Sequence, residues 1–256
     1  MHVLVAGESW ITQSTHIKGV DHFTVSSYVE GIGPLRDALE SGGHTVTHLP
    51  AHLVPDSFPS TPAELAPYDL VVLSDIGANS LLLPREVLER SATHPNRLAS
   101  LAQWVHDGGG LVMVGGYLSF TGFEAKAAFK DTPVEQVLPV TCLAHDDRVE
   151  APEGVTPAIE VEDHPALGGA QTPWPHLLGY NRTLAVEAAA VLATVGGDPL
   201  VAVREVGAGR TAVFTSDCAP HWAPPAFCEE WEGYGPLFRG LLGWAAGQDA
   251  TTSASS

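Results

Sequence analysis

Cysteine is scarce in this sequence, with three residues among 256. Cys142, Cys218 and Cys228 are too few and too scattered for a disulfide framework, and none lies in a C-x-x-C pair of the kind that holds structural zinc. Cations are scarce as well: 12 lysines and arginines stand against 30 aspartates and glutamates, which gives a formal net charge of −18. Phosphate-rich surfaces bind clustered cations, so the composition argues against nucleic acid and against anionic membranes as partners.

Long apolar runs are also missing. No run approaches the ~20 residues that a membrane helix requires, and no basic segment followed by an apolar one has the form of a secretory signal. We therefore expect a cytoplasmic protein. Its length suffices for one α/β domain over residues 1–247, and the small polar residues at 248–256 predict a disordered tail.

The first half of the sequence alternates between strand and helix patterns. Apolar runs typical of strands lie at Val3–Ala6, Thr45–Leu49, Asp69–Leu73 and Leu111–Val114, and helical spacing lies at Pro34–Glu40 and Pro95–His106. This alternation predicts a parallel sheet with helices on both faces. Between these elements we expect loops over Glu8–Asp21 and over the proline-rich Pro50–Pro67.

The second half is rich in strand patterns instead. They lie at Val137–Leu143, Val191–Val195, Leu200–Val206 and Arg210–Thr215, and a closing helix is expected at Pro236–Ala246. Gly207, Ala208 and Gly209 separate the last two strands and predict a hairpin turn.

A glycine-flanked strand is the most informative feature of the sequence. Gly108, Gly109 and Gly110 precede the apolar run, and Gly115 and Gly116 follow it. This pattern predicts a buried strand that enters a sharp turn at the carboxyl edge of the sheet, where open α/β folds bind their ligands. The turn continues with Tyr117 and Leu118 and carries no thiol.

From about Val3 to Trp244 the sequence resembles the class I glutamine amidotransferase-like superfamily, and within it a group of bacterial cytoplasmic proteins. The phrases that carry the resemblance are Gly7–Trp10, Leu73–Asn79, Gly115–Phe120, Val134–Val140, His145–Glu150, Leu178–Asn181 and Thr215–Trp222. The resemblance implies an α/β fold of the flavodoxin-like type, a three-layer sandwich with a mostly parallel sheet and a β-rich C-terminal half. Trehalose-utilisation-like proteins are similar more distantly and share this fold without the cysteine.

An active class I amidotransferase has a cysteine on the turn after a central strand, backbone N–H groups there that hold an oxyanion, and a His with a Glu after a late strand. The resemblance places the cysteine position at Tyr117, or at Gly116 if the alignment shifts by one. Ser216, Asp217 and Cys218 stand where the family has His-Pro-Glu. The resemblance therefore predicts an amidotransferase-like protein without the Cys-His-Glu triad.

Our first hypothesis is a pocket at the carboxyl edge of the sheet that binds or processes a small polar molecule. The ligand-binding candidates are Glu8, Trp10, Asp75, Asn79, Gly116, Tyr117 and Ser119. Asp217 and His221 are the candidates for general acid–base catalysis in a hydrolase- or lyase-type reaction, and backbone N–H groups of the turn would hold an oxygen of the ligand. We expect no cofactor. We also expect no metal at the charged run His145–Glu150, because neighbouring residues of a strand point to opposite faces and cannot all converge.

Two alternatives remain open. Cys218 and His221 are three residues apart, so a cysteine-dependent hydrolase or glutaminase could use them, although a free cysteine is more often a buried packing residue. The chain could instead be a non-enzymatic oligomeric scaffold. One segment is rich in aromatic residues and could wall the pocket, form a subunit interface or fill the core. We favour a wall combined with an interface, and with it a homo-oligomer. Its members are His221, Trp222, Phe227, Trp231, Tyr234 and Phe238.

Overall fold

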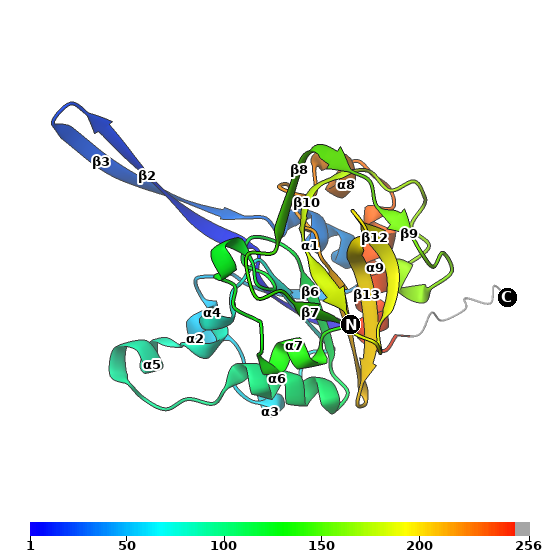
Figure 1. Ribbon diagram of the computed structural model, residues 1–256. Coiled ribbons are helices and arrows are strands. Elements are labelled where there is room, and N and C mark those ends of the chain that lie inside the picture. Colours follow the sequence, from blue (N-terminus) through cyan, green and yellow to red (C-terminus); the bar gives the residue numbers. More distant parts are fainter. Residues whose placement is uncertain (249–256) are drawn as a thin grey trace.

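The computed structural model describes residues 1–248 and has an eight-stranded mixed sheet at its centre (Figure 1). In spatial order the strands are β4 (Thr45–Leu49), β1 (His2–Gly7), β5 (Leu70–Ser74), β6 (Gly110–Val114), β14 (Gly209–Phe214), β13 (Asp198–Val206), β12 (Ala190–Val195) and β9 (Ala158–Ile159). The first five are parallel, and each pairing from β14 to β9 is antiparallel. The prediction of an α/β fold with a parallel first half and a β-rich second half is confirmed.

Side chains alternate between the two faces of the parallel strands, and each face is covered by helices. Val3, Val5 and Val72 belong to one buried cluster, which includes side chains of α1 (Gly33–Glu40) and α9 (Tyr234–Ala245). Leu4, Ala6 and Leu73 belong to the cluster on the opposite face. The helices that contribute to that second cluster are α2 (Val54–Ser57), α3 (Pro62–Leu65), α4 (Ala78–Leu82), α6 (Arg97–His106) and α7 (Pro133–Val137).

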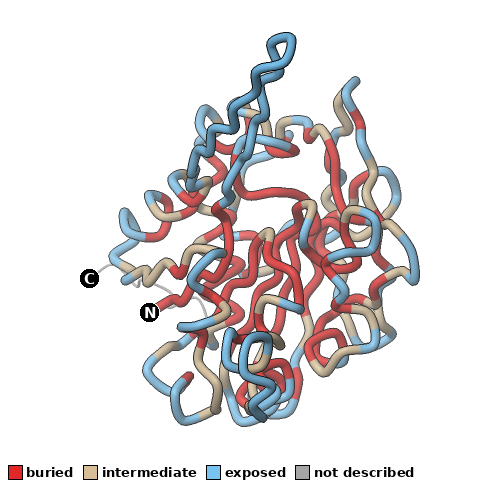
Figure 2. Tube along the Cα trace, turned by 90° about the vertical axis from the view of Figure 1, so that its left-hand side faces the viewer, coloured by how far each residue is buried: buried red, intermediate tan, exposed pale blue. Residues whose placement is uncertain are grey.

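The loop expected over Glu8–Asp21 is instead part of a long hairpin. β2 (Ser9–Lys18) and β3 (Asp21–Glu30) pair only with each other among the described residues and project away from the body (Figures 1 and 2). The segment is rich in threonine, valine, isoleucine and aromatic residues, which favour strands. The loop prediction was wrong because the apolar residues lie on both faces of the ribbon, so no one-sided pattern is present.

Two further expectations need correction. The proline-rich Pro50–Pro67 contains α2 and α3, each of which begins with a proline in its first turn. The strand expected at Val137–Leu143 is shorter, because Thr132 caps α7 and this helix continues to Val137.

The remaining elements are small. Two short antiparallel pairs join β7 (Val140–Cys142) to β11 (Thr183–Ala185), and β8 (Arg148–Val155) to β10 (Leu177–Asn181). The other helices are α5 (Arg85–Arg90), α8 (Pro225–Cys228), η1 (Phe123–Ala125) and η2 (Pro165–Leu167). Within residues 1–248, no helix is both long and apolar enough to span a membrane. The disordered tail expected from residue 248 onward lies, apart from Gln248 itself, outside the described residues.

Most of the aromatic segment after β14 is buried. Trp222, Phe227, Tyr234 and Phe238 are all buried, and three of them belong to the cluster under α9. The expectation of an exposed interface was wrong for these four residues, because Phe214 on β14 packs against Phe227 and Phe238 in the core. His221 remains exposed and Trp231 is partly buried.

Candidate functional site

Four neighbouring strands end at one edge of the sheet, and the residues that follow them converge. Glu8 follows β1 with a φ of 47°, and Asp75 follows β5 with a φ of 46°. Gly115 and Gly116 follow β6, and Asp217 comes three residues after β14. Left-handed backbone is uncommon for residues other than glycine and is concentrated at functional sites. Here it turns the chain sharply at two strand ends, and both carboxyl side chains line the same pocket.

This edge holds a pocket with a volume of about 520 Å³. Its lining residues are Glu8, Trp10, Asp75, Tyr117, Leu118, Phe123, Asp217, Ala219, Pro220 and His221. Six of the residues selected from the sequence are among them. Four are not: Gly116, Ser119 and Cys218 are buried outside the lining, and Asn79 is exposed on α4.

Glu8 is a buried acid that takes part in no ion pair within residues 1–248. Its side chain is 2% exposed, and its Oε2 accepts hydrogen bonds from Ser74 Oγ at 2.5 Å and from Cys218 Sγ at 3.6 Å. Burial raises the pKa of Glu8 well above its ordinary value, and the nearby carboxylate of Asp217 raises it further. The protonated form is therefore favoured, and Glu8 can donate a proton or a hydrogen bond.

Asp217 and His221 form a carboxylate–imidazole pair at the pocket. His221 Nδ1 lies 3.4 Å from Asp217 Oδ2, and the hydrogen bond with Asp217 raises the pKa of His221. Asp217 is buried, whereas the side chain of His221 is 43% exposed and accessible from the pocket. An imidazole oriented by a buried carboxylate can give and take protons near neutral pH.

Asp75 closes the turn that follows β6. Its Oδ1 accepts a hydrogen bond from the N–H of Leu118 at 2.7 Å, and burial raises its pKa to about 6. Ser119 supports the same turn: its Oγ accepts from the N–H of Asp75 at 3.2 Å and donates to the carbonyl of Val114 at 2.6 Å. Ser119 therefore positions Asp75 through these two hydrogen bonds and does not line the pocket itself.

The backbone N–H of Gly116 is already used. It donates to Oδ1 of Asn181 at 3.0 Å, and Nδ2 of Asn181 donates to Asp147 at 2.8 Å. Together with the bond from Leu118 to Asp75, this occupies two donors of the turn that were expected to hold an oxygen of the ligand. That expectation was wrong for Gly116 and Leu118, because the fold supplies both donors with internal acceptors.

Tyr117 stands in the pocket wall, where the resemblance places the amidotransferase cysteine. Its hydroxyl donates to Glu150 at 3.0 Å, and Nε1 of Trp222 donates to the other oxygen of Glu150 at the same distance. The ring meets His221 edge-on at 4.7 Å between centroids and stacks on Phe123 at 5.5 Å. At this position the chain presents an aromatic ring to the pocket.

Glu150, Asn181 and Phe123 were not selected as site residues from the sequence. Glu150 and Asn181 lie on β8 and β10, which pair with each other and lie outside the central sheet. Both belong to phrases that carry the family resemblance, which is the one signal that could have identified them. The charged run around Arg148 is structural: Arg148 pairs with Asp146 at 2.8 Å, and Asp147 accepts from the N–H groups of Thr121 and Gly122.

Cys218 lies beneath the pocket rather than in its lining. Its Sγ is 3.6 Å from Glu8 Oε2 and 3.5 Å from Ser74 Oγ, and burial raises the pKa of the thiol well above its ordinary value. The ion-pair partner of His221 is Asp217. A protonated thiol without an imidazole base is a poor nucleophile, so this geometry argues against the cysteine-dependent alternative.

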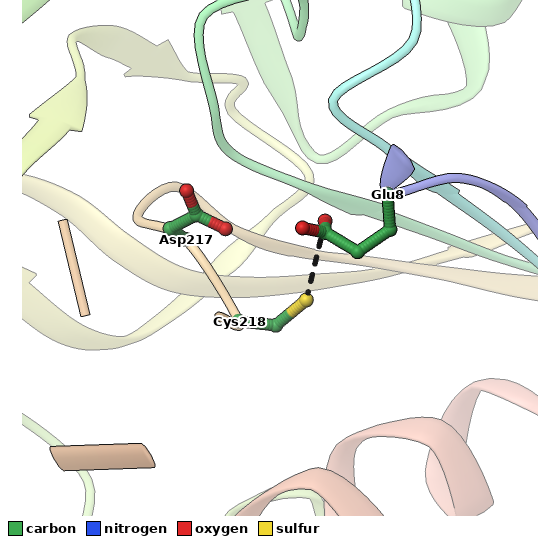
Figure 3. A group of neighbouring side chains, drawn as sticks. All are labelled: Glu8, Asp217 and Cys218. Atoms are coloured by element: carbon green, nitrogen blue, oxygen red, sulfur yellow. Dashed lines mark hydrogen bonds between the residues drawn. The ribbon is translucent and has the colours of Figure 1, made fainter. Parts of the chain in front are cut away.

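Glu8, Asp217 and Cys218 also come close to a metal-binding arrangement (Figure 3). One donor atom of each lies within 4.8 Å of the others. Two of the three groups favour their protonated forms, and a proton on a ligand atom competes with a metal ion. The protons on Glu8 and Cys218 therefore weaken the case for a cation at this place.

Two solved structures are similar to this chain over nearly its whole length. The cytoplasmic protein STM3548 from Salmonella typhimurium is 44% identical, with a TM-score of 0.91 over 95% of this chain and 98% of that chain. The cytoplasmic protein STM1381 from Salmonella typhimurium LT2 is 43% identical, with a TM-score of 0.91 over 96% of this chain and 99% of that chain.

A ThuA-like protein from Parabacteroides merdae ATCC 43184 shares the fold at 13% identity, with a TM-score of 0.55 over all of this chain and 92% of that chain. No curated protein matches. The family model described as "Putative glutamine amidotransferase" matches residues 2–247. Because this model covers nearly the whole chain and the two Salmonella proteins are more than 40% identical to it, the chain belongs to this glutamine amidotransferase-like family.

Proposed function

We propose that this family member lacks the Cys-His-Glu triad, binds a small polar molecule in the pocket at the carboxyl edge and acts on it by acid–base chemistry. The observation that carries the proposal is the convergence of Glu8, Asp75 and Asp217 beside His221. Perturbed titratable groups that meet in a concave site are typical of catalytic centres. The cytoplasmic relatives support a cytoplasmic location.

The charge of the pocket restricts the ligand. Glu8 is protonated, but the carboxylates of Asp75 and Asp217 still outnumber the one imidazole at neutral pH, so a carboxylate or phosphate ligand would meet repulsion. Trp10, Tyr117 and Phe123 offer ring surfaces on which an apolar ligand face can pack. A neutral polyol or sugar, or a molecule with an amino group, fits this combination of acidic hydrogen-bonding groups and aromatic walls.

The proton-transfer roles follow from the contacts. Asp217 orients the imidazole and stabilises its protonated form, and His221 exchanges a proton with the ligand. Glu8, which burial keeps protonated, donates a hydrogen bond. The reaction class that these groups serve is hydrolysis or elimination.

The binding step can be tested by thermal denaturation of the full chain in the presence of amino acids, amines, sugars and polyols. A ligand at 100 times its dissociation constant adds about 2.7 kcal/mol to the free energy of unfolding, or roughly 5–10 °C in Tm for a domain of this size. We expect a shift with a neutral or amino-bearing compound. Shifts with anionic compounds alone would contradict the proposal.

Matched variants separate the pocket from the surface. Asp217→Asn removes the carboxylate that orients His221, and we expect it to weaken binding or turnover of the identified ligand by about tenfold or more, as loss of a charged hydrogen bond does. Glu187→Gln removes a charge from the exposed surface and is expected to have no effect. Equal effects of the two variants would overturn the proposal.

The cysteine-dependent alternative makes the opposite prediction for Cys218→Ala. If the pocket works by acid–base chemistry, this variant keeps ligand binding and any turnover, because Cys218 does not line the pocket. Ammonia release from glutamine by the wild type, lost in Cys218→Ala, would defeat the proposal in favour of a glutaminase.

A further inference from the structure

The β2–β3 hairpin, residues 9–30, projects from the body of the monomer and is called the arm below (Figures 1 and 2). Every residue from Trp10 to Glu30 is exposed. A lone two-stranded ribbon is at best marginally stable in water, since it has no core of its own. β2 and β3 pair only with each other among the described residues, so each strand also has a free edge that can accept another strand.

Both faces of the arm carry apolar side chains. In an antiparallel pair, opposite residues share a face. The register pairs Trp10 with Val29 and His16 with Phe23 on one face, and Ile11 with Tyr28 on the other. Ile17 is 76% exposed and Phe23 48% exposed, on opposite faces. Contiguous exposed apolar surface marks an interaction site, and here each face needs cover.

The distribution of charge between the arm and the rest of the chain indicates which partner covers the apolar faces of the arm. The arm contains Lys18 against Asp21 and Glu30, so 17 of the 18 net negative charges lie outside it. Two acidic bodies repel each other, whereas two nearly neutral arms do not. A strongly cationic partner would be drawn to the body instead. The arm is therefore the surface through which a second copy of the chain can approach.

The surface area of the arm is close to that of a stable protein–protein interface. Ten residues per strand at ~3.4 Å each give a ribbon ~34 Å long and ~10 Å wide, so its two faces present on the order of 700 Å². A stable interface buries about 800 Å² per partner. We propose that two copies of this chain form a dimer through their β2–β3 arms, each arm covered by the other copy.

The test is the mass of the full chain in solution, measured by light scattering after gel filtration over a range of micromolar concentrations. We expect twice the mass of one chain for the wild type. Ile17→Glu and Phe23→Glu place a charge on each face of the arm in turn, and we expect each to weaken the dimer at least tenfold. The control is Leu88→Glu on α5, which changes an equally apolar, 64% exposed side chain outside the arm.

A shortened arm serves as a second variant in case a charge disturbs folding. Thr12 and Ser27 are opposite one another, so residues 13–26 can be replaced by an Asn-Gly turn. We expect a folded monomer whose circular dichroism melting curve stays cooperative and does not depend on protein concentration, because the arm contributes nothing to either core cluster. A monomeric wild type, or a dimer that survives the shortened arm, would overturn the proposal. An equal loss of dimer in Leu88→Glu would also overturn it.

Discussion

At the scale of single residues, the pocket depends on carboxyl groups held where water does not solvate them well. Glu8 and Asp75 lie at the ends of adjacent parallel strands, both in left-handed backbone, and Asp217 faces them from the end of β14. None of the three has an arginine or lysine partner among the ion pairs of residues 1–248. Burial without a cation raises the pKa values of Glu8 and Asp75, and this is the source of their proton-donating character.

Asp75 gives the free energy of unfolding a measurable pH dependence. Its pKa is raised from 3.8 to about 6, so the native state holds the proton more tightly than the unfolded chain, and stability falls as the pH rises from about 4 to 6. Asp75→Asn keeps an oxygen for the N–H of Leu118 but does not ionise. Relative to wild type, we expect the free energy of unfolding of the variant to gain about 2 kcal/mol between pH 4 and pH 7.

Urea denaturation at several pH values measures this gain. The control is Asp107→Asn, at the exposed end of α6, which is expected to follow the wild-type curve. Parallel curves for Asp75→Asn and wild type would show that Asp75 ionises normally in the folded protein.

At the scale of secondary-structure elements, the turn after β6 is fixed by close backbone contact. A Cβ on Gly115 would lie 2.2 Å from the carbonyl oxygen of Thr215, which is backbone and cannot move aside. Gly115 also donates its N–H to the carbonyls of Phe214 and Ser216. The turns after β6 and β14 therefore lie so close together that residue 115 must be glycine. The same close contact brings Tyr117 and Asp217 into the lining of one pocket.

We expect Gly115→Ala to lower the free energy of unfolding by about 1–3 kcal/mol or more, because it overpacks a backbone contact. Gly33→Ala is the matched control: Gly33 begins α1 and has nothing within 4 Å of the added Cβ. Urea denaturation of the two variants compares them directly. Equal stabilities would contradict the close approach of the two turns.

The central strands β1, β5 and β6 could be predicted because they are buried on both faces and their sequences are nearly continuous apolar runs. The hairpin could not, because its apolar residues lie on both faces of the ribbon and leave no one-sided pattern, although its threonine and valine residues favour strands. The convergence of Glu8, Asp75 and Asp217 followed from the rule that parallel strands end at one edge. The bond from Gly116 to Asn181 joins residues 65 positions apart, and no local pattern encodes it.

At the scale of the whole molecule, a net charge of −18 opposes both compactness and association. Raising the ionic strength from 0.01 M to 0.1 M shortens the screening length from about 30 Å to about 10 Å. We therefore expect added NaCl over this range to raise Tm and to strengthen the arm-mediated dimer. Differential scanning calorimetry and sedimentation measure the two effects, and a Tm that fell with salt would contradict the repulsion argument.

The burial of Cys142, Cys218 and Cys228 has a practical consequence. Because all three thiols are buried, a maleimide added to the native protein reacts with them slowly. One cysteine introduced on the surface is then the main attachment point for a fluorophore, a spin label or a solid support. The natural chain can thus be labelled at a chosen position without first removing its own sulfur atoms.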